Sequence, residues 1–209
     1  MNVFLFYNLF NINEIMKHLK KTGLLFLLFC GCLIGVKAQD LTIKTNLPYL
    51  LTAAPNFGAE YAVGDRVSLE LTVGANPFKL KGEKRLRHWL VCPEVRYWKE
   101  DALKGYFLGF HLLGGQYDLS GWDLPLEIMD GIKTSRYLGY AYGAGVSYGY
   151  LWTLKNNLGI EATLGIGYAT FRYDIYSLGE NPVKKADKRK GYIGPSKAAI
   201  SFVYRFNNN

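Results

Sequence analysis

Hydrophobic and polar positions alternate with a period of two along most of the chain after residue 40. In residues 158–168, for example, Leu, Ile, Ala or Tyr occupies every second position, and Gly, Glu or Thr stands between them. Successive side chains of a β-strand point to opposite faces of a sheet, so this period indicates strands and not helices. The pattern predicts eight strands, at residues 41–53, 56–63, 66–76, 87–97, 105–116, 137–152, 158–173 and 192–206.

The two faces of these strands differ in the size of their side chains. One face is large and aromatic or aliphatic, whereas the other carries Gly, Ala, Ser, Thr and scattered charges. A soluble β-sandwich is the alternative, but small side chains would pack its core poorly. The asymmetry fits a narrow barrel whose large side chains face lipid. We therefore predict an all-β fold, an eight-stranded antiparallel transmembrane β-barrel with up-and-down topology.

The lengths of the connections alternate as such a barrel requires. The second, fourth and sixth connections are short (64–65, 98–104, 153–157), whereas 77–86, 117–136 and 174–191 are long and polar and only 54–55 is brief. We expect the short connections and both termini on the periplasmic side. Aromatic residues of an interfacial girdle are expected near these short connections, namely Tyr61, Tyr97, Trp98, Tyr106, Tyr150, Trp152, Tyr204 and Phe206.

Two prolines interrupt the strand pattern, Pro48 in the first predicted strand and Pro93 in the fourth. Proline has no N–H to donate to a ladder, and a closed barrel has no edge strand to accommodate it. We expect a bulge or a missing ladder bond at each.

The N-terminal part of the chain reads as an export signal. Lys17, Lys20 and Lys21 precede an uncharged apolar run over 23–36, and a small residue, Ala38, follows. The run is shorter than the ~20 residues of a membrane-spanning helix, and the order of features is that of a cleaved signal peptide. We predict residues 1–38 as N-terminal extension and signal, and 39–209 as an outer-membrane barrel. A lipoprotein anchored at Cys32 is the alternative.

The basic excess of the chain lies mainly in two predicted outer loops. The formal charge is +8, from 25 Lys and Arg against 17 Asp and Glu. Ten residues carry the excess in the loops: Lys79, Lys81, Lys84, Arg85, Arg87, Lys184, Lys185, Lys188, Arg189 and Lys190. Solvated loop tips are often charged, but the loops could also attract polyanions such as the phosphates of lipopolysaccharide. Nothing resembles a nucleic-acid-binding motif.

Several short runs resemble an uncharacterised family of Bacteroidota outer-membrane β-barrel proteins, a domain of unknown function. These runs are Lys44–Asn46, Pro55–Gly58, His88–Trp98, Gly105–Tyr117, Tyr142–Gly149 and Glu161–Thr163. The resemblance covers about Lys44 to Phe206 and implies a small OmpA-like barrel, with some members encoded near fimbrial genes. It implies insertion by the barrel-assembly machinery, because the last predicted strand ends in aromatic residues. It carries over no catalytic residue.

The inward-facing positions of the predicted barrel hold several charges. They are Glu60, Glu70, Glu94, Arg96, Glu161, Lys197 and Arg205. Unpaired charges would be costly there, so we expect a paired network that fills the lumen. The alternative is an ion path or a carboxylate pair for acid–base chemistry, but eight strands leave an interior that side chains can fill.

No metal or cofactor is expected. His88 and Cys92 lie about 13 Å apart along one strand at ~3.3 Å per residue, too far for one zinc ion. Ser68, Ser147 and Ser201 point inward by parity, away from a lipid substrate.

We therefore expect a non-enzymatic outer-membrane protein with a structural or surface-interaction role, linked to envelope or fimbrial assembly. Its expected partners are outer-membrane lipid and lipopolysaccharide, the barrel-assembly machinery, and surface or fimbrial proteins. The alternatives are a narrow channel and a lipid A-modifying hydrolase, whose triad would have to be assembled from distant strands.

Overall fold

The computed structural model describes residues 41–52, 54–76, 84–121, 132–179 and 181–206. The chain divides into two units, 1–37 and 38–209, and all described residues belong to the second. The predicted signal segment, Lys79 and Lys81 lie outside the described residues.

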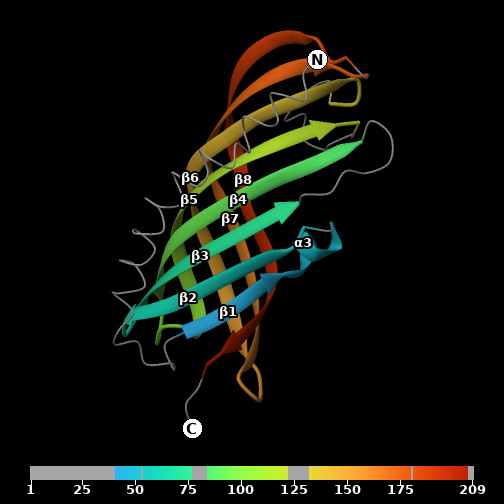
Figure 1. Ribbon diagram of the computed structural model, residues 1–209. Coiled ribbons are helices and arrows are strands. Elements are labelled where there is room, and N and C mark those ends of the chain that lie inside the picture. The colour runs from blue at the N-terminus through green and yellow to red at the C-terminus, as the bar shows by residue number, and fades with distance from the viewer. Residues whose placement is uncertain (1–40, 53, 77–83, 122–131, 180, 207–209) are drawn as a thin grey trace, which may run out of the picture. The chain divides into compact units, whose positions relative to one another are not determined.

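Eight antiparallel strands in up-and-down order close into a ring, because β1 pairs with both β2 and β8 (Figure 1). The elements are β1 (Leu41–Asn46), α3 (Leu47–Leu51), β2 (Asn56–Gly64), β3 (Val67–Asn76), β4 (Arg85–Trp98), β5 (Gly105–Ser120), β6 (Ser135–Thr153), β7 (Leu158–Ser177) and β8 (Lys184–Arg205). We call the end with the β2–β3, β4–β5 and β6–β7 connections the turn end, and the opposite one the loop end. The predicted number, order and direction of strands are confirmed.

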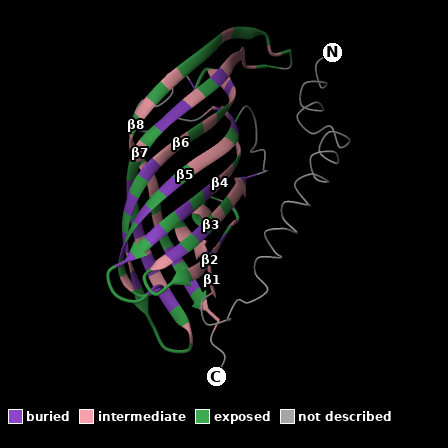
Figure 2. Cartoon of the chain, turned by 90° about the vertical axis from the view of Figure 1, so that its left-hand side faces the viewer, coloured by how far each residue is buried: buried purple, intermediate pink, exposed green. Residues whose placement is uncertain are grey.

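The period-two pattern separates an inner and an outer face of the ring. Along β6, Ser147 is buried, whereas its neighbours Val146 and Tyr148 are more than half exposed, at 55% and 54%. Burial alternates in this way along most strands (Figure 2). In the middle of the ring, charged and small residues line the inside and large apolar residues cover the outside, which is the reverse of the usual arrangement in a water-soluble protein. The predicted asymmetry of the two faces is confirmed.

The first predicted strand is wrong in its second half. β1 ends at Asn46, and Pro48 lies in the first turn of the short helix α3. Proline is well tolerated there because the first helical N–H groups have no intrahelical partner. Pro48 therefore ends β1 instead of distorting it, and the first connection is nine residues long (47–55). Among the described helices, none is long and apolar enough to cross a membrane.

The expectation for Pro93 is confirmed. Val91 pairs with Gly114 and Glu94 pairs with His111, but no pairing joins Pro93 to β5. The register is the same on both sides of the gap, so the ladder loses rungs without shifting. The register shifts at three further places that the pattern did not predict. They lie at Val63 in the β2–β3 ladder and at Lys185 and Ser196 in the β7–β8 ladder.

The strands lengthen toward the C-terminus, from 6 residues in β1 to 22 in β8. As a result, β6, β7 and β8 extend at the loop end beyond β1, β2 and β3 (Figure 1). The predicted basic loops are therefore partly wrong. Arg85 and Arg87 lie on β4, and the five basic residues of 184–190 lie on β8.

Each end of the ring has its own apolar cluster. At the turn end, Trp98, Leu103, Phe107, Leu151 and Val203 are buried together. Trp98 was predicted for the outer girdle, but it is fully buried because it shares the inward parity of the residue two positions before it. At the loop end the buried cluster consists of Tyr117, Ile132, Tyr137 and Tyr173.

Candidate functional site

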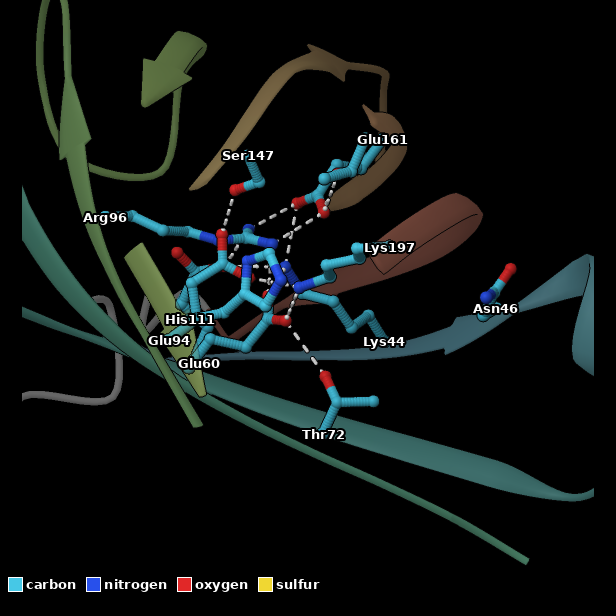
Figure 3. A network of polar contacts seen from close by, with 12 residues as sticks. Lys44, Asn46, Glu60, Thr72, Glu94, Arg96, His111, Ser147, Glu161 and Lys197 are labelled. Carbon is cyan, nitrogen blue, oxygen red and sulfur yellow. Dashed lines mark hydrogen bonds and ion pairs between the residues drawn. The ribbon is translucent and has the colours of Figure 1, made fainter. Parts of the chain in front are cut away.

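A network of charged side chains fills the middle of the ring (Figure 3). Its members come from six of the eight strands: Lys44 on β1, Glu60 on β2, Glu70 on β3, Glu94 and Arg96 on β4, Glu161 on β7 and Lys197 on β8. All are buried except Lys197, whose side chain is 12% exposed. The ring thus joins charges that lie far apart in the sequence.

Lys44 is bonded to three carboxylates at once. Its Nζ lies 2.6 Å from Glu60, 2.7 Å from Glu70 and 2.7 Å from Glu161. An ammonium group has three N–H donors and no acceptor. Three carboxylates therefore use its full hydrogen-bonding capacity.

Arg96 is the second centre of the network and is fully buried. Its guanidinium binds Glu161 through two nitrogens, at 2.9 and 3.1 Å. It also lies 2.9 Å from Glu60, 2.6 Å from Glu70 and 3.3 Å from Glu94. The planar fork of arginine suits such paired contacts with carboxylates.

Lys197 completes the network from β8. Its ammonium contacts Glu94 and lies 2.9 Å from Glu70. Glu94 also accepts a hydrogen bond from Ser147 at 2.5 Å. Gly109 leaves room for this contact, because a Cβ at that position would collide with both Glu94 and Ser147.

The network is balanced to within one charge. Four carboxylates face three cations, and each carboxylate contacts at least two of the cations. Buried ions are stable only when they are paired and their remaining hydrogen-bonding sites are used. The observed arrangement pairs every ion. Within the described part of the network, Arg96 Nε is the one buried polar atom without a hydrogen-bond partner, and it lies 3.3 Å from Glu94.

The charged layer rests directly on the apolar cluster of the turn end. The Arg96 guanidinium lies 4.1 Å from the centre of the Phe107 ring. Trp98 donates its indole N–H to Ser68 at 2.7 Å, and Ser68 donates to Glu60 at 2.5 Å. Charged and apolar side chains together fill this half of the ring.

A cavity of about 300 Å³ lies on the loop-end side of the charged layer. Its lining includes charged groups of the layer, the two glycines Gly58 and Gly74, and Tyr49 of α3. Its remaining walls include Asn46, Asn56, Leu90, Cys92, Leu113 and Ser196. The volume is at the small end of the range for ligand pockets.

Ser196 and His111 form a pair beside this cavity, with 2.9 Å between Oγ and Nε2. A serine beside an imidazole is the core of a nucleophilic site, which also needs a third group to orient the imidazole. Here the other ring nitrogen, Nδ1, has no hydrogen-bond partner in the described part of the chain. The neighbouring Glu94 is bonded to other groups, so the pair lacks the geometry of a triad.

Three of the glutamates also offer a geometry for a metal ion. Carboxylate oxygens of Glu60, Glu70 and Glu161 lie within 4.8 Å of one another. The Lys44 ammonium is bonded to all three, so it supplies the positive charge that a metal ion would bring. Outside this group, His88 lies edge-on to Tyr49, with ring centres 6.3 Å apart.

The structure brings six of the seven inward charges predicted from the sequence into one network. The exception is Arg205, which lines a separate pocket at the turn end with Thr42 and Val203. Sequence reasoning missed Lys44, although its parity with Thr42 could have shown that it points inward. It also missed Ser196, since the bulge that places Ser196 has no sequence signal.

The basic residues of the loop end form ion pairs with aspartates on neighbouring strands. Lys184 lies 2.7 Å from Asp174. Arg136 binds Asp118 through two nitrogens, at 2.7 and 2.9 Å, and Arg85 lies 3.9 Å from the same carboxylate. Part of the basic surface is therefore neutralised within the ring itself.

Comparison with known proteins gave one match. A family model with the description "Protein of unknown function (DUF3575)" matches residues 24–206, which include all eight strands. Searches of curated proteins and of solved structures gave no match.

Proposed function

Since the chain belongs to the DUF3575 family of proteins of unknown function, we propose its function from its geometry: it is a transmembrane β-barrel of a bacterial outer membrane, exported by a cleaved signal peptide. Its lumen is filled, and its role is structural or surface-interacting. The turn end and both ends of the barrel segment face the periplasm, and the loop end faces outward. This orientation is the usual one for such barrels.

The apolar outer face is the observation that carries this proposal. Val95, Phe110, Val146 and Ile166 lie side by side across four strands by register. They are 49%, 54%, 55% and 65% exposed. Soluble monomers rarely expose a continuous apolar band of this kind, whereas a barrel in lipid requires one.

The height of this band also fits a membrane. Tyr150 and Tyr140 on β6 mark its two borders and are ten positions apart (140 to 150). At ~3.3 Å per residue and a tilt of ~40–45°, ten residues span about 25 Å. The apolar band of outer-membrane barrels is about 25 Å tall.

The backbone of the ring is also suited to lipid. Each strand pairs with two neighbours, and β8 returns to β1 to complete the circle. In a bilayer core, unpaired backbone N–H and C=O groups would cost several kcal/mol each. Closure removes most of these groups from contact with lipid.

The filled lumen favours a structural or surface-interacting role over a channel. Arg96 and Lys44 bind carboxylates from several strands, and Trp98 and Phe107 pack beneath them. Ions crossing the ring would have to displace these groups. We expect no steady conductance in planar bilayers.

The first experiment is to locate the protein and test its closure in the same samples. Membranes of the expressing cells are separated on a density gradient and washed with carbonate, and the extract is run boiled and unboiled on a gel. We expect recovery in the outer-membrane fraction and a change of mobility on boiling, because closed barrels resist detergent until heated. Recovery in the soluble periplasm would contradict the membrane assignment, and an unchanged mobility would contradict a stable closed barrel.

A further inference from the structure

Two arginines stand side by side on the outer face of the ring. Arg172 on β7 and Arg189 on β8 are direct partners in the β7–β8 ladder. Directly opposed residues of an antiparallel pair have their side chains on the same face. Arg172 reaches the Tyr140 hydroxyl at 3.4 Å, and Tyr140 is on the outer face with 43% exposure. Both arginines are exposed.

The register places these arginines at the border of the apolar band that is nearer to the loop end. One row across five strands consists of Trp89, Gln116, Tyr140, Arg172 and Arg189. Toward the turn end, the second row on this face exposes the large apolar side chains of Leu112, Tyr168 and Ile193. Toward the loop end, the next row contains three aspartates, Asp118, Asp174 and Asp187. If the proposed membrane orientation holds, on which this inference rests, the row lies at the level of the outer-leaflet headgroups.

In the row of aspartates, two opposed like charges are bridged by a group of opposite charge, and the arginine pair lacks such a group. Asp174 and Asp187 are also directly opposed in the β7–β8 ladder. Lys184 lies 2.7 Å from the first and 3.7 Å from the second, so it bridges the two like charges. Within the described residues, no carboxylate forms an ion pair with Arg172 or Arg189. Like charges directly opposite one another destabilise a sheet, so an anion between the two guanidinium groups would relieve their repulsion.

The chemistry of this position selects the anion. Guanidinium groups bind phosphate oxygens in a paired, planar geometry, and the Tyr140 hydroxyl can donate to the same group. Toward the turn end, the next pair on this face is Thr170 and Gly191, and the pair after it is Tyr168 and Ile193, which are 52% and 84% exposed. They offer an apolar surface to acyl chains attached to the phosphate.

We propose that Arg172 and Arg189 form a binding site for the phosphate group of an outer-leaflet lipid. The phosphate lies between the two guanidinium groups beside Tyr140, and the acyl chains run down the barrel over Tyr168 and Ile193. A phosphorylated glycolipid such as lipid A has this combination of an anionic head and several chains. The site fixes the depth of the barrel and gathers this lipid around β7 and β8.

The test is lipid binding to the full mature barrel in nonionic detergent, followed by native mass spectrometry. The probe is diphosphorylated lipid A, compared with lipid A from which both phosphates have been removed. The variant is Arg172→Gln/Arg189→Gln, and the matched control is Arg66→Gln, an exposed arginine of the β2–β3 turn. We expect the double variant to bind at least about fivefold less phosphorylated lipid, because charge-assisted hydrogen bonds are the strong contacts of this site. The Arg66 variant should bind as the parent does.

A double Arg→Lys variant should bind between the parent and the Gln variant, because it keeps the charge but loses the fork. Equal binding by the parent and the double Gln variant would overturn the proposal, as would equal binding of lipid A without phosphate. Inorganic phosphate is the second probe. If phosphate binds the parent as tightly as the lipid does, the site binds free anions and the lipid assignment is wrong.

Gel mobility before and after boiling separates this inference from the proposed function. Suppose that the parent and the variants keep the heat-dependent mobility shift and the outer-membrane location. Equal binding of phosphorylated lipid A by the parent and the double Gln variant then refutes the arginine site alone. If the parent shows neither property, the membrane assignment itself has failed.

Discussion

Replacing Arg96 by methionine is the most direct test of the charged layer. Arg96 contacts all four carboxylates of the network and is fully buried. Methionine keeps a chain of similar length but removes the guanidinium. Four carboxylates would then share Lys44 and Lys197, and the formal charge of the layer would fall from −1 to −2.

The expected loss of stability follows from this imbalance. Removing one partner of a buried ion pair costs about 3–5 kcal/mol, because the other charge stays buried without compensation. The four contacts of Arg96 are not additive, since they share the same carboxylates. We therefore expect a loss of about 3–5 kcal/mol in the free energy of unfolding for Arg96→Met, and not a multiple of it.

The assay is equilibrium urea unfolding of the barrel refolded into lipid vesicles, followed by tryptophan fluorescence. Arg66→Met is the matched control, because Arg66 is exposed in a turn; it should change stability by no more than about 0.5 kcal/mol. The double variant Arg96→Met/Glu161→Gln restores the charge balance to −1. It should be more stable than the sum of the two single effects by about 0.5–3 kcal/mol.

Two results would refute this reasoning. One is a loss below about 1 kcal/mol for Arg96→Met with the heat-dependent mobility shift retained, which would mean that the buried carboxylates do not depend on the guanidinium. The other is strict additivity of Arg96→Met and Glu161→Gln, which would mean that the two side chains are not coupled.

Three further predictions follow from the packing. Gly109→Ala should destabilise the barrel, because its Cβ meets Glu94 and Ser147, whereas Gly114→Ala should not, as nothing lies within 4 Å of its Cβ; urea midpoints compare the two. Phe110→Arg places a charge in the apolar band and should cost about 2–4 kcal/mol in vesicles, whereas Leu154→Arg in a turn should cost less; equal costs would contradict the lipid-facing assignment. Trp98→Ala should lower the free energy of unfolding by about 3–5 kcal/mol. It should still give no current in planar bilayers, because the charged layer remains; a steady current would contradict the conclusion that this layer closes the lumen.

Local periodicity determined most of the fold. Alternation of large and small residues fixed which positions of β6 and β7 face outward, and the number and order of the strands followed from it. The same parity placed six of the charges of the network on the inner face. The errors were local: Pro48 ends β1 because a helical turn accommodates it, and β8 continues through basic residues that composition assigned to a loop.

Only the tertiary structure decided which inward charges meet. Lys44 and Glu161 are 117 positions apart in sequence and bond at 2.7 Å, because closure of the ring places β1 close to β7. The bulge at Ser196 and the opposition of Arg172 and Arg189 likewise depend on the register between strands. The physical reason is that a strand's period of two is a property of its own backbone and can be read along the chain. The stagger of one strand against the next is set by contacts distributed around the whole ring.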